Sequence, residues 1–357
     1  MRVKLSDITQ YSKGVQINGD ELVDNGDYIY LNGGINPSGR WTESNVGANT
    51  VTISEGGNSS GYINYITEPF WCGAHCYYLF NGPKNTKYLY YALKSQQDRL
   101  LAIRSGACMP NIKKSDLGKF EFEFDINEQK QNEIVATLSR VENVIACRKR
   151  ELELLDDLIK ARFVEMFGDS ASNEKGWKMN TFGDICTVRQ GLQIPISKRL
   201  TEYEEDSYEY ITVQYLHGGK EKEYIKSPKE SVKCTKDDIL MTRTGNTGMV
   251  VTNVEGVFHN NFFLIDFDRE RFEKDFLVEY LNLDLIQADI TRRAGTSTIP
   301  DLNHGEFYKI KVFEPPIDLQ KEFDEFKMQV DKSKVAVQKA LDETQTLFDS
   351  LMQEYFG

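Results

Sequence analysis

The sequence lacks the features that mark membrane and secreted proteins. No apolar stretch approaches the roughly 18 residues that a bilayer-spanning helix needs, and the opening residues MRVKLSDITQ have no hydrophobic centre of the kind found in signal peptides. Its six cysteines, at positions 72, 76, 108, 147, 186 and 234, are too few in 357 residues to form a disulfide framework, so we expect reduced thiols. These absences predict a cytoplasmic protein without a membrane partner.

Positive charge is also scarce. The chain has 43 Lys and Arg residues against 55 Asp and Glu residues, a net charge of −12, whereas a protein that neutralises nucleic-acid phosphates normally has a basic surplus. Residues 1–126 carry 12 basic and 13 acidic residues, and residues 168–317 carry 19 and 25. We therefore expect the chain alone to bind random DNA weakly. Its length and its 40% of apolar residues predict two folded domains.

The motifs of the obvious enzyme classes are missing. An amino-methyltransferase needs a Gly-rich cofactor loop and an Asp/Asn-Pro-Pro-aromatic motif that grips a flipped base, but no Gly-x-Gly occurs and the only Pro-Pro lies in EPPI (314–317). Two acid-x-Lys patterns of the nuclease type, Glu128–Lys130 and Glu325–Lys327, fall in heptad segments, where such pairs support a solvated helix face. We expect no catalytic site in this chain.

The sequence does contain an internal repeat, in which one unit is written twice. Five matched pairs follow one another in the same order, at offsets that rise from 177 to 193 residues: KLSDITQYSKG (4–14) with TFGDICTVRQG (181–191), Gly57-Asn58 with Gly245-Asn246, Pro110 with Pro300, INEQKQ (126–131) with IDLQKE (317–322), and LDDL (155–158) with FDSL (348–351). The order of elements is therefore expected to be the same in both copies.

One short motif offers possible metal ligands. CGAHC (72–76) contains Cys72, His75 and Cys76, but zinc normally takes a fourth ligand. The corresponding segment of the second copy, VFHNNF (257–262), has no cysteine. A strand that packs its thiols and an aromatic residue is the simpler interpretation, and we predict no metal site.

Each copy combines a globular part with a helical part. Residues 1–126 and 168–317 contain short β-branched or aromatic runs separated by Gly, Asn and Pro, which predict strands and turns with helices such as 86–104 and 274–293. In 127–167 and 318–357, steps of four and three alternate at the following positions: Ile134, Leu138, Val141, Ile145, Arg148, Leu152, Leu155, Ile159, Arg162 and Met166, then Phe323, Lys327, Val330, Lys334, Val337, Leu341, Thr344, Phe348, Leu351 and Tyr355. This 3.5-residue period predicts the seam of a coiled coil.

The connectivity predicts how the two helices pair. The second helix leaves its globular part with its seam unburied, and its sequence-matched partner is the first helix, so we expect the two to pack antiparallel. Each would be about 57 Å long at 1.5 Å per residue. The expected fold is mixed α/β, with two globular domains separated by two long antiparallel coiled-coil helices in a pseudo-two-fold internal repeat. Four charged residues, Arg148, Arg162, Lys327 and Lys334, dilute the seam.

This plan resembles the DNA specificity (S) subunit of type I restriction-modification systems. The resemblance covers the whole chain and rests on the duplicated order of a Gly-Asn loop, a turn of small residues followed by Pro, a Gln-Lys helix start and a Phe-Gly end, at 167–168 and 356–357. It implies that residues 1–126 and 168–317 are target recognition domains, each reading half of a split DNA site. It also implies that 127–167, the central helix, and 318–357, the C-terminal helix, set the spacer.

The same resemblance implies the partners. A specificity subunit binds double-stranded DNA, its helices dock two methyltransferase (M) subunits, and restriction/motor (R) subunits join to cleave unmodified DNA. The chain itself would be non-catalytic and hold no cofactor, because the M subunits use S-adenosylmethionine to methylate adenine N6. Two alternatives stay open: a coiled-coil scaffold whose globular parts bind proteins, and a fragment of a DNA methyltransferase or nuclease.

Residues that contact DNA can be predicted only by type. Gly-Asn loops expose N–H groups and hydroxyls that suit phosphates, Arg beside such a loop can bind guanine, and Asn or Gln can bind adenine. In the first copy the candidates are Lys13, Arg40, Asn58, Ser59, Ser60, Arg104, Asn111, Lys113 and Lys114. In the second copy they are Arg189, Gln190, Lys198, Arg199, Arg243, Thr244, Asn246, Thr247, Arg292 and Arg293.

Overall fold

The structure of the chain, a computed structural model, describes residues 1–106, 110–216, 218, 221–296 and 300–357. Cys108, one of the predicted thiols, lies outside these residues, as do parts of the two Pro-containing turns. The described chain forms two compact units: Met1–Arg150 with Gln338–Gly357, and Glu151–Val337, here called the first and the second unit. No helix within the described part is long and apolar enough to cross a membrane.

The first unit is built on a four-stranded antiparallel sheet of order β2-β8-β5-β6. Helix α2 packs against β5 and β6, and a smaller sheet of order β4-β3-β7 contains one parallel pair. Its elements are β1 (Arg2–Lys4), α1 (Leu5–Ile8), β2 (Gln10–Lys13), η1 (Gly19–Glu21), β3 (Tyr28–Leu31), β4 (Gly39–Trp41), β5 (Thr50–Ser54), β6 (Ile63–Ile66), β7 (Trp71–Cys72), β8 (Cys76–Phe80), α2 (Thr86–Lys94), α3 (Gln97–Ala102), α4 (Lys114–Gly118) and β9 (Glu121–Glu123).

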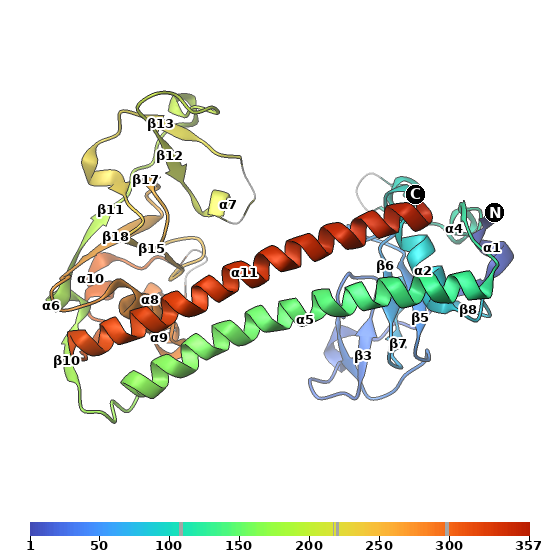
Figure 1. The fold of residues 1–357 in the computed structure, drawn as a ribbon, viewed down its shortest axis with the longest axis horizontal. Helices are drawn as coiled ribbons and strands as arrows, with labels where there is room; N and C mark the ends of the chain where they lie inside the picture. The colour runs from blue at the N-terminus through green and yellow to red at the C-terminus, as the bar shows by residue number, and fades with distance from the viewer. Residues whose placement is uncertain (107–109, 217, 219–220, 297–299) are drawn as a thin grey trace. The chain divides into compact units, whose positions relative to one another are not determined.

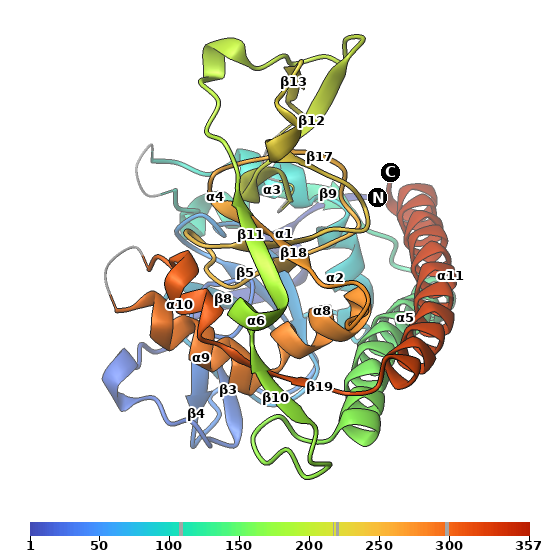
Figure 2. The same ribbon diagram turned by 90° about the vertical axis from the view of Figure 1, so that its left-hand side faces the viewer.

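The second unit repeats this plan with a sheet of order β11-β18-β15-β16 and a smaller sheet of order β13-β12-β17-β14. Figure 2 labels β11 and β18 of the first sheet and β12, β13 and β17 of the second. Its elements are β10 (Lys178–Thr181), α6 (Phe182–Ile185), β11 (Cys186–Gln190), η2 (Ile196–Lys198), β12 (Ser207–Ile211), α7 (Val213–Leu216), β13 (Tyr224–Lys226), η3 (Glu230–Val232), β14 (Lys233–Cys234), β15 (Ile239–Thr242), β16 (Val250–Val251), β17 (Gly256–Phe258), β18 (Phe262–Phe267), α8 (Lys274–Asn282), α9 (Asp284–Ala294), α10 (His304–Tyr308) and β19 (Lys311–Glu314). The predicted mixed α/β repeat is confirmed.

Strand β15 begins with three consecutive apolar residues because both of its faces are covered. In β15, Ile239 and Met241 join the core beneath the helices, whereas Leu240 joins a second core on the other face. Successive side chains of a strand point to opposite faces, so Ile239, Leu240 and Met241 contribute to both cores. Such continuous apolar runs are typical of strands buried on both sides.

Hydrogen bonds show that the two units match in detail. Tyr30 and Tyr210 are both buried, and their hydroxyls accept from the backbone N–H of Ile17 and Ile194. The strand pairing shows, however, that the offset between the copies varies. Ile53 pairs with Tyr77 of β8, and the matched Met241 pairs with Phe263 of β18. The offset there is 186 residues, so the prediction that offsets only rise along the chain is wrong. Loops of different length make the offset fall before it rises again.

Two of the predicted helices are each divided. Residues 86–104 form α2 and α3, and residues 274–293 form α8 and most of α9. Leu283 interrupts the second of these in an extended conformation, with φ −60° and ψ 137°. The bend lets Ile286 and Ile290 reach the same core as α8. Neither break contains Pro or Gly, so neither is marked by a helix-breaking residue.

The long helices α5 (Glu128–Phe167) and α11 (Ile317–Phe356) have 40 residues each (Figure 1). Every predicted seam residue is buried or half-buried. In the first unit the start of α5 shares a core with the end of α11, through Leu138 and Phe348. In the second unit the end of α5 meets the start of α11, where the rings of Phe163 and Phe323 lie 5.3 Å apart. The helices are therefore antiparallel within each unit, as predicted.

The pattern of buried residues aligns α5 with α11 at an offset of 189 residues. This corrects the offsets of 191 and 193 that the sequence matches predict. Gln131 and Gln320 are each the fourth residue of their helix, and both are buried. Each donates its Nε2 to a backbone carbonyl just before the helix, Asp125 at 2.6 Å and Pro315 at 2.9 Å. A short sequence match fits a helix in more than one register because polar residues recur at every turn. The buried positions identify the correct register.

The charged seam residues of the second unit form ion pairs. Arg162 pairs with Glu322 and Lys334 with Asp156, so both bridge α5 and α11. Lys327 is 8% exposed, and it lies 3.2 Å from an oxygen of Asp275 and 3.0 Å from one of Glu279, both on α8. This side chain therefore ties the helix to the globular part.

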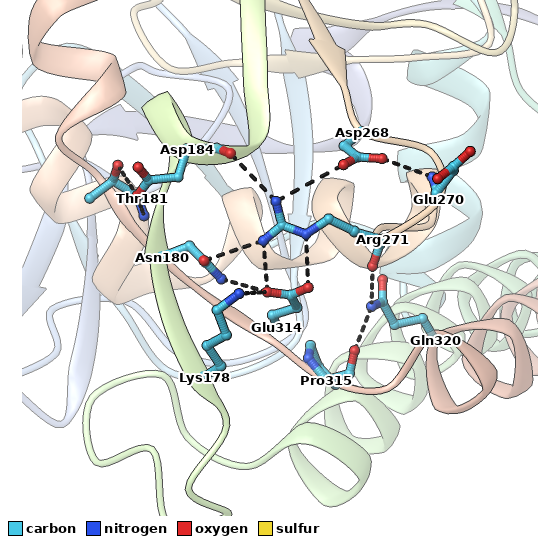
Figure 3. Close-up of polar contacts among 10 residues, drawn as sticks. All are labelled: Lys178, Asn180, Thr181, Asp184, Asp268, Glu270, Arg271, Glu314, Pro315 and Gln320. Carbon is cyan, nitrogen blue, oxygen red and sulfur yellow. Dashed lines mark hydrogen bonds and ion pairs between the residues drawn. The ribbon is translucent and has the colours of Figure 1, made fainter.

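A polar network fixes the start of α11 in the second unit (Figure 3). Arg271 donates from Nε and Nη2 to the two oxygens of Glu314, at 2.9 and 2.7 Å. These bonds, with others from Asn180 and Lys178, lower the pKa of Glu314 to about 2. Gln320 donates to the carbonyl of Arg271 at 3.0 Å, so the network joins the β10–β19 pair to the helix.

Candidate nucleic-acid interface

Four segments meet at one end of the larger sheet in the second unit. They are the end of β11, the loop after β15, the turn before β18 and the turn before α10. The N–H of Arg243 donates to the carbonyl of Asn261 at 2.7 Å, and the N–H of Leu302 donates to that of Arg243 at 2.9 Å. Gly245 and Gly248, with φ of 79° and 90°, supply the left-handed conformations that close the loop between them.

The side chains of this second loop cluster, Gln190, Arg243, Asp301 and His304, form one hydrogen-bonded group, and Asn261 adjoins it through its backbone carbonyl. Arg243 donates from Nε and Nη2 to the two carboxylate oxygens of Asp301, at 2.8 and 2.7 Å, and from Nη1 to Oε1 of Gln190 at 3.0 Å. The same Gln190 oxygen lies 2.9 Å from Nε2 of His304, which therefore acts as the donor.

Charge in the cluster is set by these contacts. The hydrogen bond from Arg243 lowers the pKa of Asp301, which keeps that carboxylate ionised at neutral pH. Burial, and then the charge of Arg243, lowers the pKa of His304 below its usual value. His304 is therefore neutral at physiological pH, and the cluster holds one cation and one anion.

The first unit builds the same backbone arrangement around other side chains. The N–H of Glu55 donates to the carbonyl of His75, and the N–H of Ile112 donates to that of Glu55, each at 2.9 Å. The side chains of this first loop cluster are Lys13, Glu55, His75 and Asn111. Lys13 pairs with Glu55, and Nδ1 of His75 lies 3.6 Å from the same carboxylate.

The loop hydroxyls mostly face inward. Ser60 is buried and donates to the carbonyl of Glu55 at 2.7 Å, and Ser59 donates to that of Gly33 at 2.6 Å. Thr247 likewise donates to the carbonyl of Arg243 at 3.2 Å. These three predicted contact residues therefore shape the loops, and the Gly-Asn tips, with Asn58 and Asn246, are the exposed parts.

Other predicted residues border the clusters. Thr244 donates to the Asn261 side chain at 3.1 Å. Arg104 precedes the bridge between Ser105 and Asn111, and Lys113 and Lys114 follow it in exposed positions at the start of α4. Arg292 and Arg293, at the end of α9, both pair with Asp289.

Four other predicted residues lie outside the clusters: Arg40 on β4, Arg189 on β11 of the larger sheet, Lys198 in η2 and Arg199 just after it. Arg40 donates to the carbonyls of Gly26 and Asp27, and Arg189 donates to that of Ser231 at 3.2 Å. Arg199 pairs with Glu223 at 3.0 Å, with both side chains 13% exposed. Lys198 is exposed in the short helix η2. For Arg40 and Arg199 these bonds give a structural role.

Sequence reasoning missed the acidic and histidine members of the clusters: Glu55, His75, Asp301 and His304. Carboxylates repel phosphate, so residue type alone does not mark acids as candidates for DNA contact. Aligning the copies position by position would have found them, since the residue before each Gly-containing loop is Glu55 in one copy and Arg243 in the other.

The CGAHC motif does not gather its side chains around one point. Cys72 and Cys76 are buried and free, and each thiol donates to a backbone carbonyl. Hydrogen bonding with Cys76 and burial raise the pKa of Cys72. His75 instead faces Glu55. Among the described residues, no three His, Cys, Asp or Glu side chains are grouped so as to hold a metal ion.

The family model for the type I restriction modification DNA specificity domain matches residues 1–156 and 174–344. The chain belongs to this family. A putative type I specificity subunit of Mycoplasma genitalium is 26% identical over 361 residues, which cover 96% of this chain and 90% of the relative.

Solved structures support the same fold. The crystal structure of the type I restriction-modification S subunit from M. genitalium covers 100% of this chain and 96% of that chain, with a TM-score of 0.65 and 24% identity. A chain from a study of complex assembly and conformational transition of the type I R-M system covers 99% and 96%, with a TM-score of 0.55 and 14% identity. Specificity subunits are non-catalytic, so family membership makes this chain a non-enzymatic subunit.

Proposed function

We propose that this chain reads a bipartite DNA site as the specificity subunit of a type I restriction-modification complex. One observation carries the proposal: the two loop clusters have the same backbone hydrogen bonds but different side chains. Bases are distinguished by the donors and acceptors at their edges. Unlike side chains on one framework therefore favour two unlike half-sites.

In this proposal residues 1–126 and 168–317 are the two target recognition domains. The Gly-Asn tips, exposed at Asn58 and Asn246, enter the DNA grooves or meet the backbone, and the cluster side chains lie behind them. The predicted contact residues around the clusters bind bases or phosphates. Arg40 and Arg199 support the smaller sheets, in keeping with their internal hydrogen bonds.

The long helices are proposed to set the spacer between the half-sites. At 1.5 Å per residue a 40-residue helix is about 60 Å long. Insertion of four residues after Arg150 and four after Val337 lengthens both helices by about 6 Å, close to two base-pair steps of 3.4 Å. We expect the lengthened protein to use half-sites about two base pairs farther apart, and an unchanged spacing would argue against the helices as the ruler.

The helices are also proposed to dock two methyltransferase (M) subunits. Both carry exposed apolar side chains: Val144, Leu154, Leu158 and Val164 on α5, and Met328, Val335 and Leu347 on α11. The M subunits use S-adenosylmethionine to methylate adenine N6, and R subunits join to cleave unmodified DNA. Because acidic residues outnumber basic residues in this chain, the M subunits supply many of the contacts to the phosphate backbone.

The test uses the complex of the chain with its methyltransferase subunits. The complex is incubated with S-adenosylmethionine and a pool of random duplexes, and the methylated molecules are sequenced. We expect two short unlike motifs separated by a constant number of unread base pairs, and no motif when the chain is omitted. One uninterrupted motif, or methylation without sequence preference, would contradict the proposal.

A further inference from the structure

The first residue of each Gly-Asn loop carries an opposite charge in the two units. Arg243 follows β15 and Glu55 follows β5, and both make the same two backbone hydrogen bonds. Glu55 is 8% exposed, whereas the Arg243 side chain is 26% exposed. The two positions are therefore equivalent in backbone and opposite in chemistry.

The guanidinium of Arg243 is held in a fixed plane. Its Nε and Nη2 bind the two oxygens of Asp301, and Nη1 binds Gln190. A guanidinium has five N–H donors, and three of them are used within the described residues. One N–H remains on each terminal nitrogen. A pair of donors in one plane matches the O6 and N7 acceptors of guanine in the major groove.

The surrounding charge favours a base over a phosphate. Asp301 is 45% exposed beside Arg243, and the hydrogen bond from Arg243 lowers its pKa, which keeps it ionised. A phosphate that approached the guanidinium would also approach this carboxylate and be repelled. The edge of guanine carries no net charge and avoids that cost.

We propose that Arg243 reads a guanine in the half-site of the second unit, with Asp301 and Gln190 as positioning residues. The inference rests on the proposed function and names the base that this site recognises. The first unit does not read guanine from the equivalent position, because the carboxylate of Glu55 has only acceptors. Its neighbour Lys13 is a point charge without the planar pair of donors.

The test compares variants of the whole complex on duplexes that carry each base in turn at every position of the wild-type motif. Arg243→Gln should lower the preference for G at one position of one half-site by about 10- to 100-fold, and leave the other half-site unchanged. Arg243→Lys keeps the charge and the pair with Asp301 but should lose most of the same preference. It also guards against misfolding of the first variant.

Arg269→Gln is the matched control. This arginine of the second unit pairs with Asp238 at 3.3 Å, away from the cluster, and its replacement should change no base preference. Uniform weakening across all sequences by Arg243→Gln would assign Arg243 to a phosphate and overturn the inference. So would an unchanged motif. If the wild-type complex methylates no split motif, it is the proposed function that fails.

A second comparison tests Asp301 as a positioning residue. Asp301→Asn should lower the preference for G at the same position by several-fold, because the guanidinium loses its fixed plane. In the Arg243→Gln background the same change should have no further effect on base preference, since it acts through Arg243. A further loss in that background would show that Asp301 contacts DNA or supports the fold independently, which contradicts its assigned role.

Discussion

The two units share a framework and differ in the side chains placed on it. The tyrosines Tyr30 and Tyr210 and the backbone bonds of both loop clusters are the same in each. At equivalent cluster positions, however, Glu55 faces Lys13 in one unit, and Arg243 faces Gln190 and Asp301 in the other. Backbone bonds and buried residues maintain the fold, so the cluster side chains are free to specify different ligands.

The long helices differ between the units in a similar way. At matched seam positions the first unit has Leu138, fully buried, and the second has Lys327, paired with two acids. Three residues earlier in each helix, Val135 of the first unit corresponds to Asp324 of the second. The contact between helix and globular part is therefore apolar in the first unit and ionic in the second.

The largest effect is expected in the aromatic core of the second unit. Phe163 is fully buried, with the rings of Phe167, Phe276 and Phe323 within 4.8–5.4 Å. Phe163→Ala should lower the free energy of unfolding by about 3–5 kcal/mol. The matched change, Met352→Ala at a half-buried site, should cost clearly less. Urea denaturation, with hydrogen exchange to report on each unit, measures the loss of unfolding free energy in the two variants. Equal losses would contradict the comparison.

The charged seam position should come next. Lys327→Leu introduces the residue type found in the first unit but leaves Asp275 and Glu279 without their cation. The free energy of unfolding should therefore fall by about 2–3 kcal/mol. Adding Asp275→Asn and Glu279→Gln should restore most of that loss. Denaturation midpoints provide the measurement, and stabilisation by the single change would show that the ion pairs are dispensable.

The smallest effect concerns pH. Burial, followed by repulsion from Asp275 and Glu273, raises the pKa of Asp324 to about 7. The folded protein then holds this proton more tightly than the unfolded chain, so stability falls as pH rises from the ordinary carboxyl pKa to about 7.

Asp324→Asn should remove that fall. After allowance for solvent screening, we expect the stability of the variant relative to the wild type to be about 1–2 kcal/mol greater at pH 8 than at pH 5. This difference should level off above about pH 7. Thermal unfolding of the variant and the wild type across this range provides the check. A gain independent of pH would mean that the Asp324 carboxyl group is not the cause.

The long helices could be predicted from the sequence because their signal is local and repeated over 40 residues. The repeat was also visible, since Gly57, Pro110 and their counterparts occupy turns with special backbone needs. The register between the helices of the two copies could not be predicted, because a sequence match does not show which Gln of a helix is buried. Glu55 and Asp301 were missed because their roles depend on partners distant in sequence, which only the fold brings together.

The central claim is that one repeated framework reads two half-sites independently. Its most direct test maps methylated adenines in cells that carry the methyltransferase subunits with either the wild-type chain or the variant Lys13→Gln, Glu55→Arg, Asn111→Asp. This variant gives positions 13, 55 and 111 of the first loop cluster the side chain types of Gln190, Arg243 and Asp301 in the second. We predict two unlike half-sites at a fixed spacing for the wild type, and a new guanine preference in only one of them for the variant. A change in both halves, or a single continuous motif, would contradict the claim.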